Sequence, residues 1–118
     1  MINCKEFLYD LDKDNFANGI SETLKAGIAD YFEIVEILAS KSIFFSPETI
    51  RTGKTRTLFR QLVDMAINTM LRNISRNLFE DASLMMLMDY GHTFSPIIED
   101  ETKFLVPHGF AVAIDMFI

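Results

Sequence analysis

The chain has 118 residues, which suits one domain and leaves no room for a two-domain enzyme. Hydrophobic residues make up 49% and charged residues 24%, a composition typical of a packed globular protein rather than a disordered one. The formal net charge of −6 argues against nucleic acid and anionic membrane surfaces as partners. The longest uncharged apolar run, 82–88, is far shorter than the roughly 20 residues that a membrane span needs. With one cysteine, Cys4, and no secretory leader, a cytoplasmic protein without disulfides is expected.

The first predicted helix is amphipathic and follows Asn18-Gly19. Its apolar residues recur at three- and four-residue steps over 20–38, which indicates one continuous helix. Asn18 or Ser21 is expected to cap its start, because a side-chain oxygen there accepts from the amides of the first turn.

Two further helices are predicted over the middle of the chain. Ser46-Pro47-Glu48 is typical of a helix entry, with serine as the cap and proline in the first turn, and a short helix is expected after it. Between Thr57 and Ile74 the apolar residues trace one stripe with polar residues opposite, which predicts a third helix.

Short helices separated by glycine and proline are predicted for the rest of the chain. A fourth helix is expected over 80–88 and ends near Gly91, which suits a left-handed C-terminal position. Helices over 97–102 and 109–118 follow, and because the last has no stop signal we expect a chain truncated inside it. No strand alternation persists, so the predicted fold class is all-α.

His92 and His108 are candidate metal ligands, since each stands next to a glycine where a loop meets a helix. Imidazoles bind zinc and similar ions, and one carboxylate would complete a three-ligand set with an open position. Glu22 is the candidate carboxylate, one helical turn from Lys25. The residues alone leave alternatives open: spacing favours a solvated surface pair for Glu22 and Lys25, and the histidines can instead satisfy backbone groups at helix ends.

Three other features are interpreted as structural. The methionines over 85–88 are assigned to the core. The segment 52–55 mimics the end of a phosphate-binding loop but lacks the earlier glycine and a preceding strand. A basic cluster is interpreted as a solvated face, with phosphate contact as the alternative; it comprises Arg51, Lys54, Arg56 and Arg60.

Three segments resemble motifs of the sugar phosphate cyclases related to 3-dehydroquinate synthase. They are Gly19-Ile-Ser-Glu22-Thr-Leu-Lys25, Asp89-Tyr-Gly-His92-Thr-Phe-Ser-Pro96-Ile-Ile-Glu99 and Pro107-His108-Gly-Phe-Ala-Val-Ala-Ile-Asp-Met116. They occur in the family's order and extend over most of the chain. The resemblance implies that Glu22, His92 and His108 bind a divalent metal, zinc or cobalt, and that Lys25 contacts the substrate.

Asp89 and Pro96 indicate a branch within this family. 3-Dehydroquinate synthases usually have asparagine and histidine at these positions, so the segment is more similar to the sedoheptulose 7-phosphate cyclases, 2-epi-5-epi-valiolone synthase in particular. The resemblance implies a catalytic role for Asp89 in an NAD- and metal-dependent reaction: transient oxidation, loss of phosphate, reduction and intramolecular aldol closure. The alternative branch is 3-dehydroquinate synthase itself.

By this resemblance, residues 1–118 form part of a C-terminal helical metal-binding domain. The N-terminal NAD-binding domain is expected to be absent, because no glycine-rich turn follows a strand. We therefore expect a chain that is inactive alone and that associates with itself or with a companion NAD-binding chain. Phe110, where the family commonly has glutamate, and Met85 and Met86, where arginine is expected, favour a non-catalytic metal-binding or helix-packing module as the alternative. A related metal-dependent alcohol dehydrogenase is a third possibility.

Overall fold

The computed structural model describes residues 4–40, 44–77 and 89–118, and within these ranges the chain forms helices and no strand. In chain order the elements are the 3-10 helix η1 (Lys5–Asp10), α1 (Lys13–Ala29), α2 (Glu33–Ala39), the 3-10 turn η2 (Thr49–Arg51), α3 (Gly53–Asn77), α5 (Ser95–Glu101) and α6 (His108–Asp115). The predicted all-α class is confirmed. The helix predicted over 80–88, with its methionines, lies outside the described residues. No helix in the described ranges is both long and apolar enough to cross a membrane.

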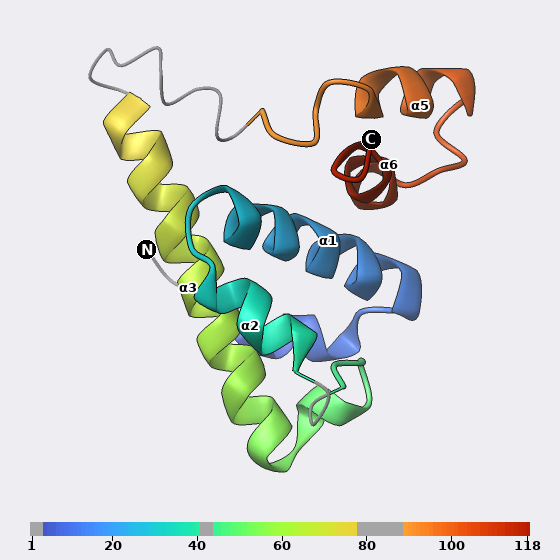
Figure 1. Ribbon diagram of the computed structural model, residues 1–118. Helices are drawn as coiled ribbons and strands as arrows, with labels where there is room; N and C mark the ends of the chain where they lie inside the picture. The colour runs from blue at the N-terminus through green and yellow to red at the C-terminus, as the bar shows by residue number, and fades with distance from the viewer. Residues whose placement is uncertain (1–3, 41–43, 78–88) are drawn as a thin grey trace.

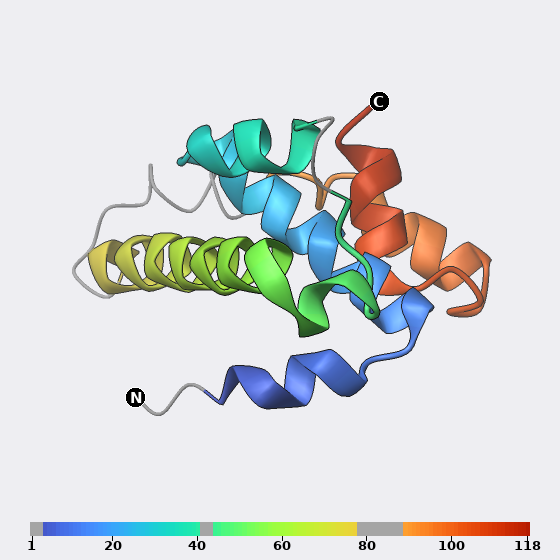
Figure 2. The ribbon, with the colours of Figure 1, turned by 90° about the horizontal axis from the view of Figure 1, so that it is seen from below.

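Helix α1 is the centre of the fold. It packs against α2, α3 and α6, and lies between the long helix α3 and the pair α5 and α6 (Figures 1 and 2). On the side of α3, Phe16 stacks on Phe59 with ring centroids 5.6 Å apart, and the fully buried Ile50 of η2 joins them. This apolar cluster fixes one face of α1, so that its opposite side is available to α6.

The prediction of one continuous helix over 20–38 is wrong, because the chain breaks at Asp30. The Asp30 amide ends α1 by donating to the carbonyls of Ala26 and Gly27. Helix α2 then folds back so that the fully buried Ile34 packs on Gly27, where a β-carbon would lie 2.9 Å from the Ile34 side chain. The apolar stripe runs through this break, so its period does not reveal that the chain turns.

The predicted start of the first helix is also wrong, because Asp12 rather than Asn18 or Ser21 is the N-cap. Its Oδ1 accepts from the backbone amide of Asn15 at 2.8 Å. This hydrogen bond, with a second from the Asn15 side chain, holds the pKa of Asp12 below its ordinary value. The helix begins earlier than the apolar stripe because Phe16, in its first turn, packs into the core.

The middle of the chain departs from the predicted boundaries. The short helix expected after Ser46-Pro47 is only the turn η2, although Ser46 Oγ does accept from the Thr49 amide at 3.2 Å, as the predicted cap requires. Helix α3 extends beyond the predicted 57–74 at both ends. It starts at Gly53, whose φ of +62° is strained for any residue with a β-carbon.

Helices α5 and α6 are joined by a carboxylate. Helix α5 begins earlier than predicted, with Pro96 in its first turn. The prediction of a last helix over 109–118 that contains the end of the chain is wrong, because α6 begins at His108 and ends at Asp115. Asp115 Oδ2 accepts from the backbone amides of Phe94 and Ser95, at 2.6 and 2.8 Å. The Asp115 side chain of α6 thereby satisfies the free amides at the start of α5 and holds the two helices together.

Candidate metal centre

Glu22 and Lys25 lie one turn apart in the second half of α1 and pair with each other. Lys25 Nζ is 3.2 Å from Glu22 Oε2, and Lys25 is only 4% exposed. The interpretation of a solvated surface pair is therefore wrong. Helix α6 packs against α1, and the Lys25 side chain is buried while the Glu22 side chain is partly exposed. Helical spacing alone does not reveal this burial.

His92 completes a turn whose geometry depends on glycine. The His92 amide donates to the Asp89 carbonyl at 2.8 Å, and Gly91 has φ +75°. A β-carbon on Gly91 would lie 3.0 Å from the Val112 side chain, so the turn approaches α6 closely. His92 Nδ1 comes 3.2 Å from Lys25 Nζ. Asp89, the predicted catalytic residue, is exposed in this turn.

His108 reaches Glu22 through a contact between its neighbour and α1. The Gly109 amide donates to Asn18 Oδ1, and a β-carbon on Gly109 would lie 2.9 Å from the Asn18 carbonyl carbon. Asn18 stands about one helical turn before Glu22. The close approach at Gly109 therefore brings His108 Nε2 to 3.2 Å from Glu22 Oε1.

The structure thus brings together the three residues predicted as metal ligands. Glu22, His92 and His108 each offer one ligand atom, and these atoms lie within 4.8 Å of one another. The two imidazole rings have centroids 5.2 Å apart and are inclined by 51°. Two histidines and one glutamate form one of the ligand sets of catalytic zinc, with the fourth position open. Their metal-binding role itself stays a prediction.

One oxygen shows that these residues fit a cation. Glu22 Oε1 is buried and has no hydrogen-bond donor among the described residues, although His108 Nε2 lies 3.2 Å away. A buried carboxylate oxygen without a donor is unfavourable. A divalent ion between this oxygen and the two imidazoles would satisfy it, so the set fits zinc or cobalt.

Glu99 of α5 is a site residue that the sequence analysis did not identify. Its Oε1 lies 2.9 Å from His108 Nδ1, and its side chain is 16% exposed. At position 110, where the resemblance implies a glutamate near this histidine, Phe110 stands instead. A signal was present, since Glu99 closes the same motif as His92, but only the packing of α5 on α6 decides that it meets His108.

A hollow of about 240 Å³ between α1 and α3 borders Glu22. Its other lining residues are mostly apolar: Thr23, Ala26, Ala66, Ile67, Met70 and Leu71. Glu22 therefore has His92 and His108 beside it and also borders a mostly apolar hollow.

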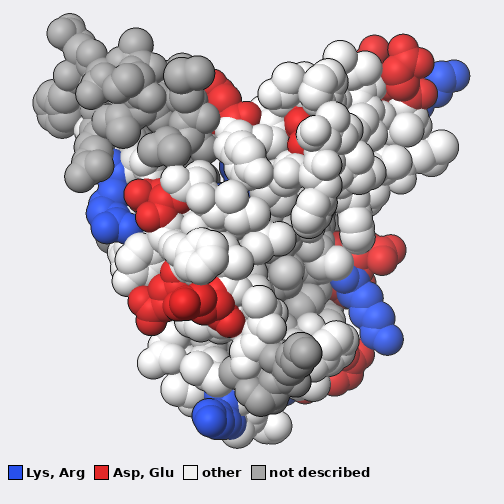
Figure 3. Space-filling model, viewed as in Figure 1, with Lys and Arg blue, Asp and Glu red and all other residues white. Residues whose placement is uncertain are grey.

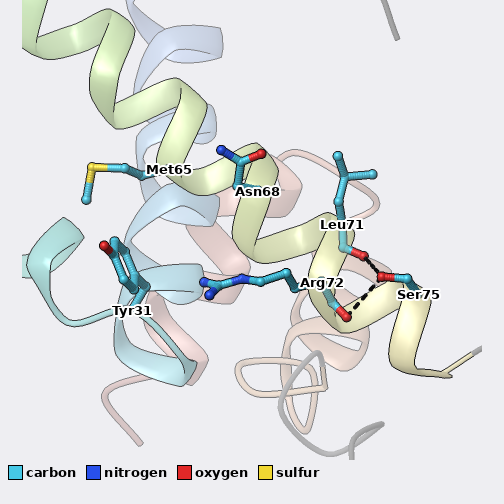
Figure 4. Close-up of a pocket in the computed structure, with 6 residues that line it drawn as sticks. All are labelled: Tyr31, Met65, Asn68, Leu71, Arg72 and Ser75. Carbon is cyan, nitrogen blue, oxygen red and sulfur yellow. Dashed lines mark hydrogen bonds between the residues drawn. The ribbon is translucent and has the colours of Figure 1, made fainter.

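A larger hollow, of about 450 Å³, lies along α3 (Figure 4). It is lined by Tyr31, Met65, Asn68, Leu71, Arg72 and Ser75. The Arg72 guanidinium points toward the Tyr31 ring, 5.5 Å from its centroid, and lies 3.8 Å from Asp30 Oδ2. None of the predicted site residues lines this hollow, so it is separate from the candidate metal centre.

The three arginines of the basic cluster contact η1. Arg51 donates to the Tyr9 carbonyl at 2.7 Å, and Arg56 and Arg60 donate to the Tyr9 hydroxyl at 3.3 and 3.2 Å. Burial acts to raise the pKa of Tyr9, but the two guanidinium hydrogen bonds outweigh it and the pKa falls. Arg51, Lys54 and Arg56 are exposed, so the interpretation of a solvated face is confirmed, although the arginines also hold η1. The segment 52–55 leads into α3 and follows no strand in the described part of the chain, which agrees with its exclusion as a phosphate loop.

Comparison with known proteins places this geometry in context. A family model described as 3-dehydroquinate synthase C-terminal matches residues 19–118, a range that holds all three candidate ligands. No solved structure matches the chain.

Curated relatives carry two names. The chain is 33% identical to a 2-epi-5-epi-valiolone synthase of Actinomyces sp over 93% of its length, and 33% identical to one of Actinoplanes sp. over 95%. It is 34% identical to a 3-dehydroquinate synthase of Campylobacter concisus over 93%. The matched region is 29%, 28% and 29% of these relatives, so the chain spans less than a third of their length.

Proposed function

Because the chain belongs to the family of 3-dehydroquinate synthase C-terminal domains, we propose that it forms the metal-binding part of a sugar phosphate cyclase. The observation that carries the proposal is the convergence of Glu22, His92 and His108. These residues would hold zinc or cobalt, which when bound polarises hydroxyl and carbonyl oxygens of the sugar.

The neighbouring side chains have proposed roles of their own. Lys25 places a buried ammonium beside Glu22 and His92, where it can hold an anionic oxygen of the substrate close to the ligand set. Asp89, exposed in the turn before His92, would contact the sugar. His108 remains exposed on one side, which leaves a route for the substrate to enter.

The reaction we propose is cyclisation of sedoheptulose 7-phosphate to 2-epi-5-epi-valiolone, with loss of phosphate. Asp89 and Pro96 support this branch through the resemblance described above, and relatives named 2-epi-5-epi-valiolone synthase are among the matches. The second candidate is 3-dehydroquinate synthase, since a relative of that name is equally similar.

The NAD that this reaction needs would come from another domain or a companion chain, and the chain alone would be inactive. Exposed apolar side chains on α5, α6 and their flanks support association with such a chain or with a second copy: Phe94, Ile97, Phe104, Leu105, Ile114, Phe117 and Ile118. On the face in Figure 3 the area over α6 is mostly without charge, whereas the outer end of α5 carries acidic and basic side chains. Sedimentation of the purified chain that gives a monomer at every concentration would argue against self-association.

Calorimetric titration with zinc and cobalt tests the metal site. Glu22→Ala, His92→Ala and His108→Ala should each abolish the same single metal-binding site. Glu33→Ala, at an exposed glutamate of α2, should leave that site intact. Absent binding, or binding indifferent to the three substitutions, would contradict the proposal and favour a helix-packing module without metal.

The branch is tested by substrate preference. Binding of sedoheptulose 7-phosphate and of the 3-dehydroquinate synthase substrate to the zinc-loaded chain is compared by NMR titration. We expect the former to bind more tightly, and Asp89→Asn with Pro96→His to reduce that preference. A reversed preference in the wild-type chain would favour 3-dehydroquinate synthase.

A further inference from the structure

His108 differs from His92 in what holds its ring. Its Nδ1 lies 2.9 Å from Glu99 Oε1, and a carboxylate accepts, so Nδ1 is the ring nitrogen that donates to Glu99. Its other nitrogen, Nε2, lies 3.2 Å from Glu22 Oε1 and faces the ligand set. The contact with Glu99 therefore holds the ring from the side away from the ligand set, with Nε2 directed at the place a cation would take.

His92 Nδ1 has no carboxylate partner of this kind within the described part of the chain. Its Nδ1 lies 3.2 Å from the Lys25 ammonium, a donor, and 3.4 Å from the Tyr90 carbonyl, an acceptor. These two neighbours favour opposite tautomers of the His92 ring. Of the two imidazoles, His108 is the one that the fold orients in advance.

The position of Glu99 suits such a role. Its side chain is mostly buried, and its helix, α5, is tied to α6 through the hydrogen bonds of Asp115. The element that carries Glu99 and the element that carries His108 are thus held at a defined spacing. The same arrangement, a carboxylate on the outer nitrogen of a ligating histidine, orients the ring and raises its basicity in metal sites generally.

We propose that Glu99 is a positioning residue of the metal centre, which acts through His108 Nδ1 to set the orientation of that ring. The proposal rests on the proposed function for the identity of the ligand, but the hydrogen bond between Glu99 and His108 is a property of the metal-free chain. It can therefore be tested whether or not metal binds.

The test compares Glu99→Met, which removes the acceptor at nearly constant size, with the conservative Glu99→Gln. Glu101→Met is the matched control, because it makes the same change at an exposed position of the same helix. Long-range ¹H–¹⁵N NMR of the metal-free chain reads whether His108 Nδ1 carries a hydrogen-bonded proton, and calorimetry with zinc alone reads affinity. Circular dichroism checks folding, and Glu99→Ala replaces Glu99→Met if the latter does not fold.

We expect the wild-type chain and Glu101→Met to show a hydrogen-bonded proton on His108 Nδ1. In Glu99→Met this signal should be lost and zinc affinity should fall ~10- to 100-fold, with a smaller loss in Glu99→Gln, whose amide oxygen can still accept. A folded Glu99→Met with the wild-type Nδ1 signal and affinity would overturn the proposal. If the wild-type chain binds no zinc, the proposed function fails, and the Nδ1 signal alone decides the role of Glu99.

Discussion

The ammonium nitrogen of Lys25 lies 3.2 Å from Nδ1 of His92, although 67 residues separate them in the chain. The same nitrogen is 3.2 Å from Glu22 Oε2. Lys25 therefore touches two of the three proposed ligands. A positive charge at this place competes with a divalent cation for the same carboxylate and imidazole, which gives Lys25 an effect on metal binding as well as a proposed contact with substrate.

Lys25→Met should raise the zinc affinity of the isolated chain by roughly tenfold, because it removes a like charge from beside the ligand set. Calorimetric titration measures this. Lys13→Met is the control, since it removes the same charge from the other end of α1, where the side chain is 80% exposed. A loss of affinity in Lys25→Met alone would mean that the ammonium supports the ligands instead of competing with the metal.

Asp115→Ala should destabilise the chain by about 1–3 kcal/mol, because the part-buried amide of Phe94 and the buried amide of Ser95 lose their acceptor. Asp115→Asn should cost less, since both amides donate to the same oxygen and an amide oxygen can replace it. Urea unfolding measures the change. Asp100→Ala, at an exposed position of α5, is the control, and an equal loss there would point to a general effect of charge.

Two glycines should respond in opposite directions to alanine. Gly109→Ala should destabilise the fold by about 1–3 kcal/mol, because its β-carbon would collide with the Asn18 backbone where α6 meets α1. Gly19→Ala should stabilise it by about 0.5–1 kcal/mol, since it lies inside α1 with nothing within 4 Å of the new carbon. Thermal unfolding of both variants checks this, and a neutral Gly109→Ala would refute the close contact.

Asp12→Asn should remove a pH-dependent part of the stability. The pKa of Asp12 is lowered in the folded chain by the Asn15 amide, so its carboxylate stabilises the fold above the unfolded pKa, about 3.9, and this is lost as the pH falls through the folded pKa. Asparagine also caps helices but does not titrate there. The stability advantage of the wild-type chain over the variant should therefore begin to shrink below about pH 5 and continue to fall as the pH drops through the folded pKa, as measured by urea unfolding. An advantage that is constant with pH would contradict it.

Much of the local structure could be predicted from single segments. The stripe over 57–74 predicts the central part of α3. Ser46 accepts from the Thr49 amide at the start of η2, as the predicted cap requires. The sequence also indicates Glu22, His92 and His108 as candidate ligands, because imidazole and carboxylate side chains bind divalent metals. These inferences use only the chemistry of each residue and its near neighbours.

Three features depended on the tertiary structure: the break at Asp30, the burial of Lys25 and the pairing of Glu99 with His108. The sequence by itself determined an all-α chain with a candidate ligand set, since helical period and residue chemistry are local properties. Only the tertiary structure decided which side chains meet, because a periodic apolar face indicates that a helix buries one side and does not specify what packs against it. Here the packing partner is α6, whose close approach to α1 at Gly109 places His108 beside Glu22.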